Sequence, residues 1–261
     1  MTLIVRPGYG GAAVSDPDAQ TYLQAVEVAD NQALEQGVQQ AVNQFVIGCK
    51  ADGIWTAIKA SCILAGARTR LGALTPLVGA APTPFNFIDA NYDRKTGLIG
   101  DGTSKYLNSN RSNSTDPQNN NHNACWVSTP GTGVLMASSA SLTGQNYMDI
   151  TTAPATRLSS RSVAFNSSAS GTAVAGLYGH SRSSSAQASY RCPQGSGLDT
   201  YSSQATDTRN VFLYTGTDNG ISFSGWSLAR LAFYSIGESL NLALLDARVS
   251  ALITAFGVAI P

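Results

Sequence analysis

The sequence has few charged residues. They make up 12% of the chain, against the roughly 25% that is usual in soluble domains. Sixteen basic and sixteen acidic residues give a formal net charge of zero. The basic surface that nucleic-acid binding requires is therefore missing, and we expect no nucleic-acid partner. Near-zero net charge also removes the repulsion that keeps small proteins apart, so it favours self-association.

Long apolar runs and tight metal-ligand spacings are lacking as well. No stretch approaches the roughly 20 apolar residues that cross a bilayer, and no basic patch with an apolar core marks a secretory signal near Met1. We therefore predict no membrane partner and a protein that is made in the cytoplasm. The cysteines form no CxxC motif, so we expect them to be reduced and buried, with no metal and no cofactor. They are Cys49, Cys62, Cys125 and Cys192.

Histidine and glutamate, two residues typical of catalytic sites, are scarce. His122 and His180 lie in stretches rich in Ser and Asn, so we expect them in surface loops with no chemical role. The three glutamates, Glu27, Glu35 and Glu238, fall in segments that we predict to be helical. A glycosidase needs two carboxyl groups that flank the scissile bond, and the predicted strand region contains no paired aspartates. We therefore predict no catalytic residues and no enzymatic activity.

Three polar segments are candidate binding regions. The stretch Asp89–Asp93 spaces three side-chain oxygens as a calcium loop does, but Arg94 replaces the required glycine and no glutamate closes the loop. A turn with Asx side chains is the favoured interpretation. Seven asparagines lie between Asn108 and Asn123, and serines dominate Ser181–Ser189. Each tract is a solvated connection or a polar contact surface, and sugar binding by Asn side chains with Tyr or Trp platforms is a further candidate.

Helical patterns occur at both ends of the chain. Ser15-Asp16-Pro17 is a helix-start signal, and the amphipathic pattern that follows to Gly48 predicts one helix, or two with a break near Asp30-Asn31. A short helical segment is expected over 53–60, with a strand from Cys62. Residues 237–256 predict a C-terminal helix that Gly257 and Pro261 stop. The apolar face of each long helix requires a cover, from the chain's own sandwich or from a neighbouring subunit.

From Pro76 onward, short apolar or alternating runs are separated by Gly, Pro, Asn, Asp and Ser, which is typical of an all-β sandwich. We predict a mainly β fold: an antiparallel jelly-roll or concanavalin-like sandwich over 76–261 with a C-terminal helix, preceded by an N-terminal arm and helical segment over 1–75. The expected strands are Phe85–Ile88, Lys105–Leu107, Ala124–Ser128, Val134–Ala137, Tyr147–Thr151, Ser162–Phe165, Ala173–Tyr178, Ala186–Arg191, Val211–Thr215 and Trp226–Tyr234.

Three blocks of the sequence resemble a module of bacteriophage and prophage structural proteins. They are Ala25–Leu34, Phe85–Arg111 with its GDGTSKYLNSNR run, and Phe233–Val249 with its FYSIGESL run. The resemblance implies a concanavalin-like jelly roll found in virion proteins such as capsid decoration proteins and tail components. It carries over no functional residues, because fold and function separate freely in this class.

On that basis we predict a non-enzymatic virion structural protein, a capsid decoration or cement protein. It would bind the major capsid protein or tail components as a homo-oligomer, with a trimer favoured, and would be located in the virion after synthesis in the host cytoplasm. The alternative is a tail-associated receptor- or glycan-binding module, with a glycan as its ligand. A carbohydrate-cleaving enzyme is retained as a third hypothesis because the fold permits it.

Overall fold

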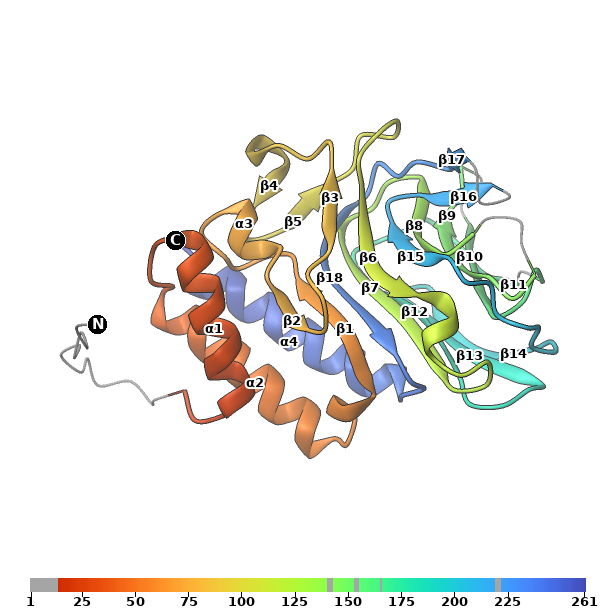
Figure 1. Cartoon of the computed structure of the whole chain (residues 1–261), viewed down its shortest axis with the longest axis horizontal. Helices are drawn as coiled ribbons and strands as arrows, with labels where there is room; N and C mark the ends of the chain where they lie inside the picture. The colour runs from red at the N-terminus through yellow and green to blue at the C-terminus, as the bar shows by residue number, and fades with distance from the viewer. Residues whose placement is uncertain (1–13, 140–142, 153–154, 165, 219–221) are drawn as a thin grey trace.

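The computed structural model describes residues 14–139, 143–152, 155–164, 166–218 and 222–261. Three layers are stacked in it (Figure 1). A helical layer covers one face of a β-sheet, which we call sheet A, and the other face of sheet A packs on a second sheet, sheet B. The helical layer consists of α1 (Pro17–Asp30), α2 (Gln36–Ala51) and α4 (Leu242–Ala259).

Sheet A has nine antiparallel strands, with β7 and β18 near its centre and β14 at one end. Its main path runs through β14 (Gly195–Thr200), β13 (Gln187–Cys192), β12 (Gly176–Arg182), β7 (Asn121–Thr129), β18 (Arg230–Gly237), β1 (Ile58–Ile63) and β2 (Pro76–Val78). Two short strands, β4 (Tyr92–Asp93) and β5 (Gly97–Ile99), join it beside β18.

Sheet B has seven antiparallel strands and carries a small hairpin beside β8. Its path runs through β11 (Asn166–Ser170), β10 (Ala155–Ser160), β9 (Asn146–Ile150), β8 (Gly133–Ala137), β15 (Asn210–Leu213), β6 (Tyr106–Ser112) and β3 (Thr83–Phe85). The hairpin pairs β16 (Gly216–Asp218) with β17 (Ser222–Ser224). A short helix, α3 (Arg70–Ala73), and three 3-10 turns, Trp55–Ala57, Asp89–Asn91 and Asn113–Thr115, complete the described elements.

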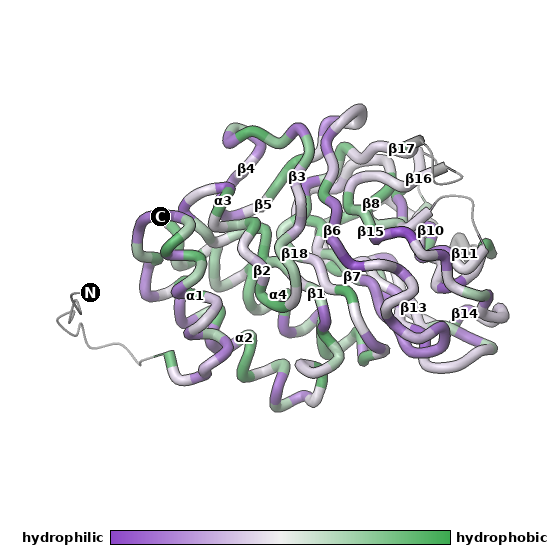
Figure 2. Tube along the Cα trace, viewed as in Figure 1, coloured by the Kyte–Doolittle hydropathy of each residue, from purple (hydrophilic) through white to green (hydrophobic). Residues whose placement is uncertain are grey.

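Side-chain alternation along the central strands builds two separate cores. On β18, Phe233 belongs to the core beneath the helices, whereas its neighbour Tyr234 belongs to the core between the sheets. Successive strand residues point to opposite faces of a sheet, so one buried strand serves both cores. The ring of Phe45 on α2 meets that of Phe233 edge-on at a centroid distance of 5.7 Å. Figure 2 shows hydrophobic stretches along α4, β1 and β18, and a more hydrophilic end of the molecule at β13 and β14.

The predicted break in the N-terminal helical region is confirmed. Asp16 caps α1 by accepting the backbone N–H groups of Asp18 and Ala19, and α1 ends at Asn31 in the left-handed conformation with φ of 50°. Helix α2 then begins at Gln36. Both helices supply residues to the core on sheet A, so the chain's own sandwich covers their apolar faces.

Several predicted boundaries differ from the structure. Within the predicted helical segment 53–60, the helical turn is limited to Trp55–Ala57, and β1 already begins at Ile58. Because β1 lies between β18 and β2, sheet A includes residues on both sides of the predicted boundary at residue 76. At the other end, β18 carries the chain to Gly237, and α4 begins only after its capping residue Asn241. Gly257 does not stop α4, which continues to Ala259.

The alternating segment Ser162–Phe165 is not a strand over its described part. Residues 162–164 connect β10 to β11, and Phe165 lies outside the described residues. Conversely, the prediction omitted β14, because two glycines and an aspartate give Gly195–Thr200 a low strand propensity. Six cross-strand pairs with β13 hold β14 in place. Tertiary pairing thus overrides local propensity at this edge.

The predicted fold class is confirmed: the chain is a mainly β, antiparallel sandwich with helices before and after it. The prediction for the cysteines is confirmed as well, because all four are free and buried. Helix α4 is long and apolar enough to cross a bilayer, but Leu245, Val249, Leu252 and Phe256 on one face of it pack within this chain.

Candidate functional site

A groove follows the edge of sheet A beside the helical layer. Helix α4 lies over β12 and β13, while the β13–β14 hairpin extends away from the helices (Figure 1). The corner between α4 and these strands is hollowed into three adjoining cavities of about 300, 460 and 450 Å³. We call the three together the edge groove, and name them the first, middle and third hollow.

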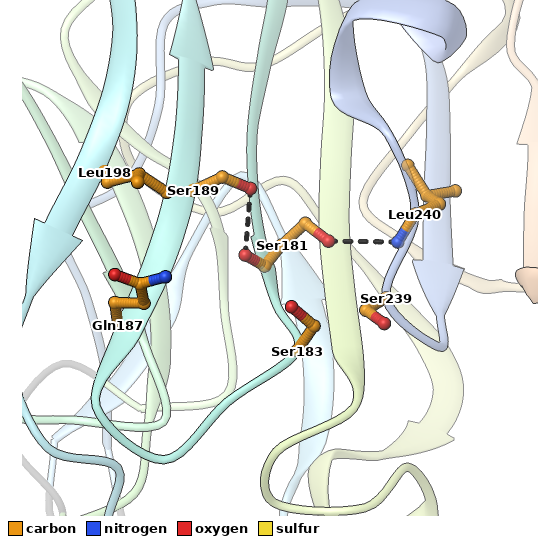
Figure 3. Close-up of a pocket in the computed structure, with 7 residues that line it drawn as sticks. All are labelled: Ser181, Ser183, Gln187, Ser189, Leu198, Ser239 and Leu240. Carbon is orange, nitrogen blue, oxygen red and sulfur yellow. Dashed lines mark hydrogen bonds between the residues drawn. The ribbon is translucent and has the colours of Figure 1, made fainter.

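The first hollow is polar (Figure 3). Ser181 holds its inner wall, because its hydroxyl accepts the backbone N–H of Leu240 at 3.0 Å and its carbonyl accepts the hydroxyl of Ser189 at 3.0 Å. The exposed side chains of Ser183 and Gln187 stand at its rim. The serine tract 181–189 therefore contributes a concave polar surface. The lining residues are Ser181, Ser183, Gln187, Ser189, Leu198, Ser239 and Leu240.

The middle hollow joins the other two. It shares Ser189, Leu198 and Leu240 with the first hollow, and Arg191 and Ser196 with the third. Leu198 is 63% exposed and, with Leu240 and Leu242, makes this hollow more apolar than the first. The remaining lining residues are Tyr190, Gly197, Asn241, Leu242 and Ala243.

The third hollow combines an aromatic side chain with an ion pair. Trp126 on β7 is half-buried and packs against the core beneath the helices. Arg191 on β13 donates from Nε to Oδ2 of Asp246 on α4 at 2.6 Å, and the hydroxyl of Ser250 donates to Oδ1 of Asp246 at 3.3 Å. The cavity therefore presents an indole, a guanidinium and a carboxylate. The other lining residues are Ala175, Gly176, Leu177, Cys192, Pro193, Gln194, Gly195 and Ser196.

The hairpin between β13 and β14 shapes the third hollow. Gln194 is fixed in its turn, because its amide nitrogen donates to the carbonyl of Thr172 at 3.1 Å. At Gly195 a Cβ atom would meet nothing within 4 Å, so this position opens onto free space. At Gly197 it would lie only 2.9 Å from the ring of Tyr190. Burial raises the pKa of the Cys192 thiol, so this cysteine stays protonated and unreactive at neutral pH.

A cluster of aromatic side chains on sheet B is the other notable surface feature. Phe85 stacks on Tyr106 at a centroid distance of 4.3 Å, and Tyr106 lies 4.5 Å from the ring of Phe223. Phe212 and Trp226 complete the cluster. Because these rings pack on one another around the β16–β17 hairpin, we assign them a role in packing. The concave edge groove is the better candidate for a binding site.

The predicted surface positions of both histidines are wrong. His122 on β7 is 0% exposed and His180 on β12 is 1% exposed. The His122 ring is hydrogen bonded to the carbonyl of Glu238 at 2.6 Å and to the hydroxyl of Ser235 at 2.7 Å. Desolvation lowers the pKa of His122 to about 4 and that of His180 to about 3, so both are neutral at pH 7.

The asparagine-rich stretch 108–123 was predicted to be either a solvated connection or a polar contact surface, and it is not a solvated connection. It comprises the end of β6, a 3-10 turn and the start of β7, and Asn113, Asn121 and Asn123 are buried. The guanidinium of Arg161, itself 1% exposed, donates to the carbonyl and the side-chain oxygen of Asn113. Asn113 and Asn121 thus join a buried polar network at one end of the sandwich, whereas the side-chain amide of Asn123 has no hydrogen-bond partner among the described residues.

The glutamates have structural contacts outside the edge groove. Glu35 pairs with Arg94 at 2.7 Å, and this guanidinium holds the pKa of the carboxyl below its usual range. The prediction that Glu238 lies in a helix is wrong. It lies between β18 and α4, where it pairs with Lys59 at 3.1 Å. Glu27 accepts the backbone N–H of Leu34. None of these three carboxylates lines a hollow of the groove.

The segment Asp89–Asp93 forms the predicted turn. Asp93 accepts the backbone N–H groups of Lys95 and Thr96, which is an Asx turn. Asp89 pairs with Arg70 at 2.9 Å. Within the described ranges, no group of three or more His, Cys, Asp or Glu side chains is placed to hold a metal ion.

Comparison with known proteins shows a remote similarity of fold. No family model matches the sequence, and no curated protein matches it either. Among solved structures, a mutant of Trypanosoma rangeli sialidase displaying trans-sialidase activity is similar at 9% identity and a TM-score of 0.48, over 82% of this chain and 39% of that one. A GH54 α-L-arabinofuranosidase is similar at 9% identity and a TM-score of 0.41, over 61% of this chain and 41% of that one. A Ruminococcus gnavus IT-sialidase CBM40 bound to α2,3-sialyllactose is similar at 10% identity and a TM-score of 0.37, over 51% of this chain and 82% of that one.

These similarities correct two predictions from the sequence. The prediction of a capsid decoration or cement protein is contradicted, because the similar structures named above are two glycosidases and a sialidase CBM40. The prediction that the chain is not an enzyme is contradicted on the same ground. The chain spans about two fifths of the length of the first two structures. At these identities and TM-scores the likeness concerns the fold, and no substrate or residue role is transferred from it.

Proposed function

We propose that the protein binds glycans in its edge groove. The observation that carries this proposal is the third hollow, where Trp126 lies beside the Arg191–Asp246 ion pair in a cavity of about 450 Å³. This volume lies within the range of roughly 300 to 1,000 Å³ that is usual for small-molecule sites. Serine, glutamine and asparagine side chains in the first and middle hollows supply further hydrogen-bond donors and acceptors along the groove.

The residues of the third hollow match the chemistry of a sugar. One face of a pyranose ring carries C–H groups, and an indole such as that of Trp126 offers an apolar surface for it. The ring also carries neighbouring hydroxyl groups, each of which donates and accepts. Arg191 supplies only donors and ionised Asp246 only acceptors, so the pair serves both roles of a vicinal diol. Hydrogen bonds to charged groups are the stronger ones.

A glycan array probed with the labelled full chain tests the proposal, followed by calorimetric titration of the bound glycans. Ser196→Tyr is the blocking variant, because Ser196 lies opposite Arg191 on the groove face of the hairpin and lines both the middle and the third hollow. Gly257→Tyr is its matched control, since it adds the same ring at a position of α4 that has no neighbour within 4 Å and lines none of the three hollows. We expect Ser196→Tyr to weaken binding at least tenfold and Gly257→Tyr to leave it unchanged.

A second pair of variants tests the ion pair. Asp246→Asn keeps the shape but removes the charge of the acceptor, so glycan affinity should fall several-fold. Asp52→Asn is the control. Asp52 pairs with Arg248, which is on α4 like Asp246, but Asp52 lines none of the three hollows. Absence of any glycan binding, or full binding by Ser196→Tyr, would overturn the proposal.

A further inference from the structure

We infer that the edge groove accommodates an extended, uncharged oligosaccharide rather than a single sugar. This inference rests on the proposed function and specifies its ligand class. Three observations support it: the continuity of the three hollows, the charge balance of their lining, and the chemical difference between the two ends.

Continuity sets the length of the ligand. Adjacent hollows share lining residues, so they follow one another along β13 from Gln187 at one end to Arg191 towards the other. Both side chains lie on β13, four residues apart. At about 3.3 Å per residue this separation is about 13 Å, and Trp126 lies beyond Arg191 in the third hollow. A single pyranose ring occupies only one of these hollows, whereas a linear chain of several units follows the strand.

Charge balance sets the kind of sugar. Among the residues that line the three hollows, the charged ones are Arg191 and Asp246, and they neutralise each other at 2.6 Å. The rest of the polar lining consists of Ser hydroxyls and of Asn, Gln and Tyr side chains. A carboxylate on every unit of a polyuronide would therefore lose water without a cationic partner. Hydroxyl groups of a neutral glycan find donors and acceptors along the whole groove.

The two ends assign different roles to the subsites. The third hollow provides the aromatic side chain and the ion pair, so it binds one unit tightly. The first hollow provides the exposed Ser183 and Gln187 at its rim, so it adds hydrogen bonds only for a chain long enough to reach it. Leu198, 63% exposed between the two ends, offers apolar surface to the intermediate units.

Calorimetric titration with malto-, cello- and manno-oligosaccharides of one to six units tests this inference, with oligogalacturonates of the same lengths as the charged comparison. For at least one neutral series we expect affinity to rise at least tenfold from the monosaccharide to the tetrasaccharide. The oligogalacturonates should bind at least tenfold more weakly than that series. Equal affinity for the monosaccharide and the hexasaccharide, or preference for the oligogalacturonate, would overturn the inference.

Two variants locate the subsites. The double change Ser183→Ala and Gln187→Ala should weaken binding of the hexasaccharide several-fold and leave the disaccharide unaffected, because only the longer chain reaches the first hollow. Ser196→Tyr should weaken both. Glycan binding that Ser196→Tyr abolishes but that shows no dependence on chain length would overturn the extended ligand and leave the proposed function intact. Failure of every glycan to bind would overturn both.

Discussion

His180 on β12 lies directly opposite Asn123 on β7 in the interior of the sandwich. Each is 1% exposed, and neither ring nitrogen of His180 nor either amide atom of Asn123 has a hydrogen-bond partner among the described residues. A buried polar group without a partner costs about 1 to 3 kcal/mol. The paired strands β12 and β7 are therefore locally destabilised at this position. The adjacent residue of β7, His122, has both ring nitrogens hydrogen bonded.

Replacing the two histidines separately should give opposite results. His122 and His180 are equally buried, but only His122 bonds to Ser235 and to the Glu238 carbonyl. We expect His122→Leu to lower the free energy of unfolding by about 1 to 3 kcal/mol, because it leaves these two partners without their hydrogen bonds. We expect His180→Leu to leave that free energy unchanged or to raise it by about 1 kcal/mol. Urea denaturation followed by circular dichroism measures both, and equal losses would contradict the assignment.

Stability should also fall in mild acid. The pKa values of His122 and His180 are lowered in the folded state from 6.5 to about 4 and about 3. The unfolded chain therefore binds more protons below pH 6.5, so the stabilisation is fully present above that pH and is lost as pH falls towards the folded pKa values. The two groups together predict a slope of about 2 kcal/mol per pH unit between pH 6 and 5. In His180→Leu the slope measured by urea denaturation should be halved, and an unchanged slope would rule out this histidine as a cause.

The two classes of secondary structure differed in how far sequence could predict them. Apolar residues that recur about every 3.6 positions predict a helix whatever surface it packs against. The apolar face with Leu245, Val249 and Leu252 was therefore predictable from the sequence. Buried polar strands give no such signal. Asn121-His122-Asn123 has the composition of a loop, and its polar partners come from distant parts of the chain: Ser160 bonds to Asn121, and Ser235 and the Glu238 carbonyl bond to His122.

The edge groove was beyond sequence analysis for a related reason. Arg191 and Asp246 are 55 positions apart, and Trp126 lies on a third element, β7. No spacing rule relates these positions, because the route of the chain between β7 and α4 decides which of them meet. The serine tract 181–189 was recognised as a candidate contact surface, since its composition alone suggested a polar face. Its concave shape comes from the position of α4 beside β13.

Removal of the N-terminal helices should abolish folding. Helices α1 and α2 place Leu23, Val38 and Phe45 in the core on sheet A, so a chain without residues 1–50 would expose that face of the sheet. We expect the truncated chain to be insoluble or to lack a cooperative unfolding transition. In the full chain, Phe45→Ala should cost about 3 to 5 kcal/mol. A soluble, cooperatively unfolding truncated chain would show that the sandwich is stable without its helical layer.

The same reasoning applies to α4, where two positions on one helix give a matched pair. Leu245 is 0% exposed and packs in the core between sheet A and the helices, whereas Val258 is 85% exposed. Leu245→Ala should therefore cost about 2 to 5 kcal/mol, and Val258→Ala should change stability by less than about 0.5 kcal/mol. Because the contact of Leu245 is within the chain, its loss should be the same at every protein concentration. Denaturation midpoints measured over a hundredfold range of concentration check this expectation. A midpoint that rises with concentration in the unsubstituted protein but not in Leu245→Ala would show that this face of α4 also contacts a second subunit.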